Sequence, residues 1–143
     1  MKDIYLVFIS VVCIILSALF GHYYPPIGIE LTPVILIITG VIVFNNLKFQ
    51  NVFLKVLLFF SFVALNDLLI KLYAGGRHDY EGLAWTKLFL YIGLLPSYFI
   101  LVKAIWLDRF AGQTSKIVSI LVFPILVVIY LAISRDLGLG TEY

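Results

Sequence analysis

The chain has 143 residues, of which 63% are hydrophobic, 16% aromatic and only 13% charged. Soluble domains average about half apolar and about a quarter charged residues, and disordered chains are poor in aromatics, so this composition excludes both classes. The net charge of +2 is small and scattered, which argues against nucleic acid as a partner. A single cysteine, Cys13, excludes an internal disulfide framework. We therefore expect an integral membrane protein embedded in a lipid bilayer.

Five stretches are apolar enough to cross the hydrocarbon layer, which requires a helix of about 20 mostly apolar residues. They are residues 4–20, 27–44, 53–73, 83–107 and 117–133. Turn-forming or polar residues separate them, such as Pro25-Pro26 and Gly75-Gly76. The sequence thus predicts one all-α membrane domain over residues 1–143, a compact bundle of five transmembrane helices with short loops.

The fourth stretch fits a membrane best. Trp85 and Trp106 lie 21 residues apart, about 31 Å along a helix, and tryptophan prefers the two membrane interfaces. Pro96 and Pro124 fall inside the fourth and fifth stretches and are expected to kink them. Proline is tolerated there because neighbouring groups can satisfy the carbonyls that it frees.

Two of the stretches have a second interpretation. The uncharged core of the second, Leu31 to Phe44, is only 14 residues long, so it crosses only if Glu30 lies at the interface; re-entrant insertion is the alternative. The first stretch has the length of a signal peptide. However, a signal peptide begins with a positively charged region, and here Asp3 adds a negative charge to it. No clear cleavage site follows either, so we expect a retained helix.

Five crossings place the two termini on opposite sides of the membrane. Six Lys and Arg residues fall on the amino-terminal side and four on the other, which favours a cytoplasmic amino terminus and an outside carboxyl terminus. The expected location is the bacterial cytoplasmic membrane. In this orientation both histidines lie at the outer face.

An acidic residue inside the third stretch is the most costly feature of the sequence. Asp67 lies about four residues past the middle of this stretch, roughly 6 Å from the midplane. A charged side chain at that depth costs about 2.5–3.5 kcal/mol on insertion scales. Lys71 follows one turn later in the favourable order for an i,i+4 pair, and Asn66 stands beside Asp67. Asn66, Asp67 and Lys71 are therefore predicted to form an intramembrane polar site, either a proton or cation relay, a docking point, or a structural pair.

A second candidate site lies in the outer loops, where imidazole and carboxylate groups gather. Its members are His22, Glu30, Arg77, His78, Asp79 and Glu81. Such groups can bind zinc or share a proton in acid-base chemistry, but a metal site needs at least three of them to converge in space, and a solvated turn is the simpler interpretation. We predict no catalytic residue, no metal and no cofactor.

Three functions follow, in order of preference. The first is a non-enzymatic structural or accessory subunit that packs against other membrane subunits or copies of itself. The second is an ion, proton or small-solute transport element that uses the intramembrane polar site. The third is a membrane enzyme with an outer-face His/Asp/Glu site. Short loops and the absence of phosphate-binding, nucleophile-elbow and zinc-protease motifs favour the first.

Overall fold

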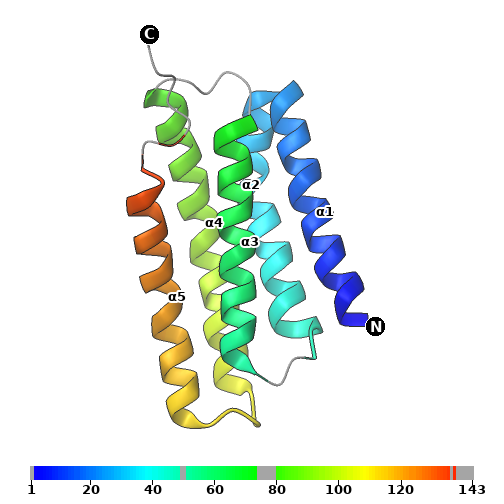
Figure 1. Cartoon of the computed structure of the whole chain (residues 1–143), viewed down its shortest axis with the longest axis vertical. Helices are drawn as coiled ribbons and strands as arrows, with labels where there is room; N and C mark the ends of the chain where they lie inside the picture. The colour runs from blue at the N-terminus through cyan, green and yellow to red at the C-terminus, as the bar shows by residue number, and fades with distance from the viewer. Residues whose placement is uncertain (1, 49–50, 74–79, 136, 138–143) are drawn as a thin grey trace.

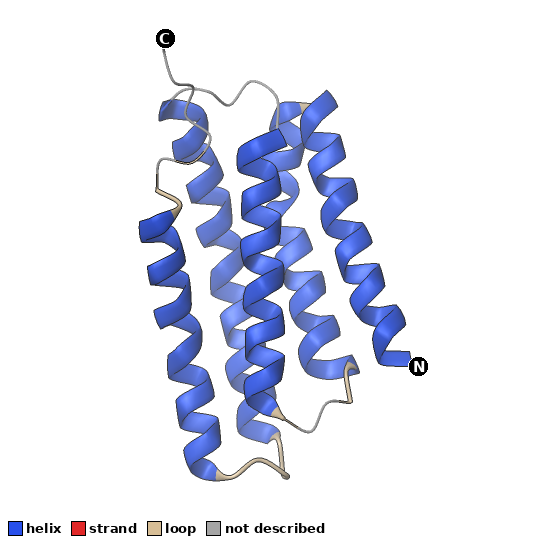
Figure 2. Ribbon diagram, in the orientation of Figure 1, coloured by secondary structure: helices blue, strands red, loops and turns tan. Residues whose placement is uncertain are grey.

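The computed structural model describes residues 2–48, 51–73, 80–135 and 137. Within these residues the chain is helical and forms no β-strand (Figure 2). The helices are α1 (Lys2–Tyr23), α2 (Pro25–Val41), the π-helical turn η1 (Ile42–Asn46), α3 (Val52–Tyr73), α4 (Tyr80–Leu107) and α5 (Gln113–Ile133). The predicted all-helical fold is confirmed.

Among the described residues, five helices are long and apolar enough to cross a membrane, which indicates a multi-pass membrane protein. The second span is longer than its 14-residue uncharged core suggested, because α2 and η1 together run for 22 residues from Pro25 to Asn46. A continuous helix of that length extends about 33 Å, enough for a full crossing. Glu30 lies in its second turn with an exposed side chain.

The first connector is much shorter than predicted. Residues 21–26 were expected to form a loop, but only Tyr24 lies between α1 and α2. Pro25 and Pro26 open α2, where the missing N–H groups have no helical partner to lose. Gly21 continues α1 instead of ending it, and a Cβ atom on Gly28 would overlap the Cα atom of Gly21. The two glycines thus allow α1 and α2 to pack backbone against backbone.

The helices run up and down in one bundle (Figure 1). α2 packs against α1 and α4, and α3 packs against α1 and α5. Among the described residues α5 contacts only α3 and α4, so it lies at the periphery. α1 begins near the lower end in Figure 1 and α5 ends near the upper end, so the chain enters and leaves the bundle at opposite ends.

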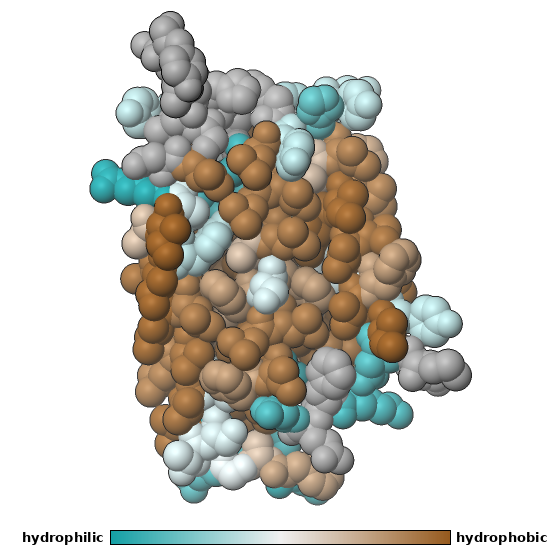
Figure 3. All heavy atoms as spheres, viewed as in Figure 1, coloured by the Kyte–Doolittle hydropathy of each residue, from teal (hydrophilic) through white to brown (hydrophobic). Residues whose placement is uncertain are grey.

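Aromatic rings join three helices in the core. Phe59 of α3 stacks on Phe123 of α5 with centroids 5.3 Å apart, and Phe123 stacks in turn on Tyr98 of α4 at 6.0 Å. Phe44 meets Phe59 edge-on at 5.5 Å. Figure 3 shows an apolar band across the middle of the visible face, with hydrophilic residues at both ends. This distribution matches a molecule that spans a hydrocarbon layer.

Proline in α5 leaves a carbonyl that a neighbouring helix satisfies. Pro124 has no N–H, so the Ile120 carbonyl loses its usual helical donor. The hydroxyl of Tyr98 on α4 donates to this carbonyl at 3.3 Å. The expected compensation by a neighbour is present at Pro124, and it ties α5 to α4.

Candidate functional site: a buried charge network between α3 and α5

Asp67 and Lys71 form the expected pair one turn apart on α3. Lys71 Nζ lies 2.7 Å from Asp67 Oδ2, and both residues are only 1% exposed. The pair therefore lies inside the bundle and neither charge faces solvent or lipid. A charge pair in this setting is held by direct contact, because bulk solvent does not reach it.

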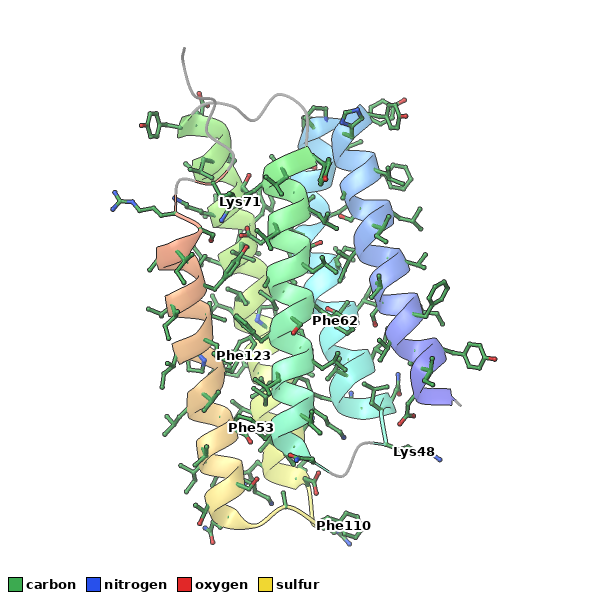
Figure 4. The ribbon with its side chains drawn as sticks, viewed as in Figure 1. Lys48, Phe53, Phe62, Lys71, Phe110 and Phe123 are labelled. Carbon is green, nitrogen blue, oxygen red and sulfur yellow. The ribbon has the colours of Figure 1, made fainter. Side chains whose placement is uncertain are left out.

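Tyr130 of α5 and Ser134, the C-cap residue that follows this helix, complete the network. The hydroxyl of Tyr130 donates to Asp67 Oδ2 at 2.6 Å. Lys71 Nζ donates to the Ser134 hydroxyl at 3.2 Å and to the Ser134 carbonyl at 3.3 Å. It also lies 5.7 Å from the centroid of the Tyr130 ring. Figure 4 places Lys71 in the upper part of the bundle, between α3 and the end of α5.

Lys71 has two electrostatic partners. One is the Asp67 carboxylate, and the other is the carboxyl-terminal end of α5, where Ser134 is the C-cap residue. The last carbonyls of a helix have no intrahelical donors and carry partial negative charge, so a cation stabilises this end. The ammonium group thus joins α3 to α5 while neutralising Asp67.

Asn66 does not join this network. Consecutive helical residues point about 100° apart, so Asn66 faces away from the side shared by Asp67 and Lys71. Its side chain is fully buried, and neither amide atom has a hydrogen-bond partner among the described residues. Asp67 Oδ1 is likewise unpartnered in the described part of the chain. The predicted site of three residues is therefore an ion pair with one unpartnered carboxylate oxygen, beside an amide that has no partner among the described residues.

The outer-loop candidates do not converge where they are described. His22 Nδ1 donates to the Tyr73 carbonyl at 3.1 Å, which holds the ends of α1 and α3 together. Glu30 and Glu81 are exposed, and no group of three potential metal ligands occurs among the described residues. Arg77, His78 and Asp79 lie outside the described residues.

Sequence reasoning missed the contribution of α5, because that stretch carries no charge. A signal was present, however. Tyr130 and Ser134 are four residues apart, the same spacing as Asp67 and Lys71. A tyrosine hydroxyl inside an apolar helix needs a partner, and a polar face with the same one-turn repeat is suited to supply it.

No family model, curated protein or solved structure matches this chain. We therefore infer the function of the protein from the geometry of the bundle.

Proposed function

We propose that this protein is a non-enzymatic subunit of a membrane complex and that it acts by packing against another transmembrane helix. We place its amino terminus in the cytoplasm and its carboxyl terminus outside, in a bacterial cytoplasmic membrane, on the distribution of Lys and Arg.

The observation that carries this proposal is the closure of the charge network. Asp67 and Lys71 are both 1% exposed, and their partners Tyr130 and Ser134 come from the same chain. These charges hold the peripheral helix α5 on the bundle, and both charged residues are too deeply buried to meet a dissolved substrate. Other molecules would then bind to the outer surfaces of the bundle and not to the buried network.

One surface is suited to a partner helix. A groove of about 260 Å³ runs between α4 and α5, and its lining is almost entirely apolar. Tyr91 lines it, about 9 Å deeper than Trp85 along α4. Within the described residues the Tyr91 hydroxyl has no hydrogen bond, and lipid tails cannot accept one. We therefore propose, as the occupant, a transmembrane helix that presents a hydrogen-bond acceptor to Tyr91.

Site-specific photocrosslinking in native membranes tests this proposal. A photoreactive phenylalanine replaces Leu95, which lies in the groove, or Phe8, which is 65% exposed on α1. We expect a protein adduct of defined mass from position 95 and none from position 8. An adduct of twice the chain's mass identifies a second copy, and another mass identifies a different subunit. Only lipid adducts at both positions would contradict the proposal.

A second candidate function is a proton or ion pathway through the bundle. Its support is the pair of unsatisfied positions on α3, the Asn66 amide and Asp67 Oδ1, which are buried without partners among the described residues. Buried polar atoms of this kind commonly bind ordered water, and water beside a carboxylate and a tyrosine hydroxyl is the arrangement of a proton relay.

Flux through purified protein in liposomes decides between the two functions. The transport function requires a measurable proton or cation flux in the wild type that Asp67→Asn abolishes while the fold persists. Glu81→Gln is the control, because Glu81 is exposed at the start of α4. A wild type without flux removes the transport candidate and leaves the packing function in place.

A further inference from the structure

A second hollow lies at the opposite end of the bundle from Lys71. It has a volume of about 290 Å³ and is bounded by η1, the first turn of α3, the end of α4, and Asp108 that follows α4. Figure 4 shows Lys48 and Phe110 at this lower end, where α3 begins and α4 ends. In a membrane-spanning bundle this end lies at the interface, which Trp106 also marks.

The lining of this hollow changes from apolar to polar. Its apolar part comes from Phe44, Val52, Ala104, Ile105 and Leu107, and its polar part from Asn45, Lys55 and Asp108. Such a boundary between hydrocarbon-like and charged walls is the environment that the glycerol and headgroup of a phospholipid require.

Two opposite charges line the hollow without pairing with each other. Lys55 and Asp108 are both partly buried, and among the described residues neither takes part in a salt bridge. Asp108 Oδ1 accepts the backbone N–H groups of Phe110 and Ala111, at 2.8 and 3.2 Å. Its other oxygen has no hydrogen bond within the described chain, so it is free to bind a cation.

We propose that this hollow binds the headgroup of a zwitterionic phospholipid that carries a primary amine. Lys55 binds the phosphate, and Asp108 accepts hydrogen bonds from the ammonium group, since charge-assisted hydrogen bonds are the strongest that these side chains make. A quaternary ammonium lacks the N–H donors that Asp108 requires, and an anionic headgroup is repelled by the carboxylate. The lipid tails run along the apolar wall. The proposal depends on membrane insertion and not on any protein partner.

Native mass spectrometry of the detergent-purified chain tests this site. The protein is mixed with equal amounts of phosphatidylethanolamine, phosphatidylcholine and phosphatidylglycerol of identical tails, and the retained lipid is counted. We expect the wild type to retain the ethanolamine lipid about tenfold over each of the others, as one additional charge-assisted contact provides. Equal retention of the three lipids, or displacement of all of them by inorganic phosphate, would overturn the proposal.

Two variants assign the roles of the charges. Asp108→Asn keeps the oxygen that accepts the turn N–H groups and removes the charge, so it should abolish the preference over phosphatidylglycerol. Lys55→Gln should lower retention of all three lipids, and Lys55→Arg should restore it. Lys103→Gln, exposed on α4 and outside the hollow, is the matched control and should change nothing. A preference that survives Asp108→Asn excludes the carboxylate as the amine ligand.

Discussion

The charge pair on α3 makes a strong and unusual prediction about stability. Lys71→Met removes an ammonium that contacts Asp67 Oδ2 at 2.7 Å and both oxygens of Ser134 at 3.2 and 3.3 Å. It leaves Asp67 buried, with only the Tyr130 hydroxyl as a partner. Breaking a buried ion pair from one side costs about 3–5 kcal/mol, because the remaining charge is uncompensated. We expect a loss of that size in the free energy of unfolding.

The double variant Asp67→Asn with Lys71→Met should be more stable than Lys71→Met alone. The asparagine amide still accepts the Tyr130 hydroxyl, and no charge remains in the bundle. Replacing both members of a buried pair is often nearly neutral, so we expect a recovery of about 2 kcal/mol relative to the single variant.

Unfolding by sodium dodecyl sulfate in mixed micelles measures these differences, with tryptophan fluorescence and circular dichroism as independent signals. The four proteins of the cycle are the wild type, Asp67→Asn, Lys71→Met and the double variant. If the two single effects simply add, within about 0.5 kcal/mol, the residues do not interact and the reasoning is refuted.

Further predictions concern the contacts between helices. Tyr130→Phe should cost about 1–2 kcal/mol because it removes the donor to Asp67, whereas Tyr91→Phe should change the stability of the isolated chain by less than about 0.5 kcal/mol; equal effects in the same unfolding titration would contradict this. Tyr98→Phe should lower the free energy of unfolding by about 1 kcal/mol in the wild type and by much less in a Pro124→Ala background, since the introduced alanine supplies its own N–H to the Ile120 carbonyl. An equal loss in both backgrounds would show that the hydrogen bond to the Ile120 carbonyl is not the source of the stabilisation. Gly28→Ala should destabilise the protein by about 1–3 kcal/mol because α1 and α2 must separate to make room for the added methyl group. Gly40→Ala should be tolerated, because its Cβ atom would lie 3.4 Å from the Phe59 ring. If thermal melting in detergent shows that both variants are equally stable, the close packing of α1 and α2 is contradicted.

The number, type and positions of the helices follow from the sequence, because hydropathy over about 20 residues decides which segments enter a bilayer. The largest error, at residues 21–26, has a local cause. Gly21 and the Pro25-Pro26 pair indicate a loop by composition, but glycine is also the residue that lets two helices approach, and proline is tolerated in the first turn. Which role applies depends on the facing helix.

The candidate site was only half predictable for a related reason. An i,i+4 pair within one helix, such as Asp67 and Lys71, is set by helical geometry, and the structure contains it. The partners contributed by the α5 end of the chain depend on which helices are neighbours in the bundle. Hydropathy identifies the helices but does not determine which of them pack together. Asn66 was grouped with the pair by its position beside Asp67, although adjacent residues face different directions.

Labelling of single cysteines tests the central claim most directly: a charge pair sealed inside a bundle that spans the membrane. In a Cys13→Ala background, cysteine replaces Lys48, Glu81 or Asn66, and intact spheroplasts are treated with a membrane-impermeant maleimide. We predict that position 81 reacts from outside, position 48 reacts only after permeabilisation, and position 66 reacts only after denaturation. Reaction of position 66 in intact membranes would contradict the account, because bulk water would then reach the residue next to Asp67.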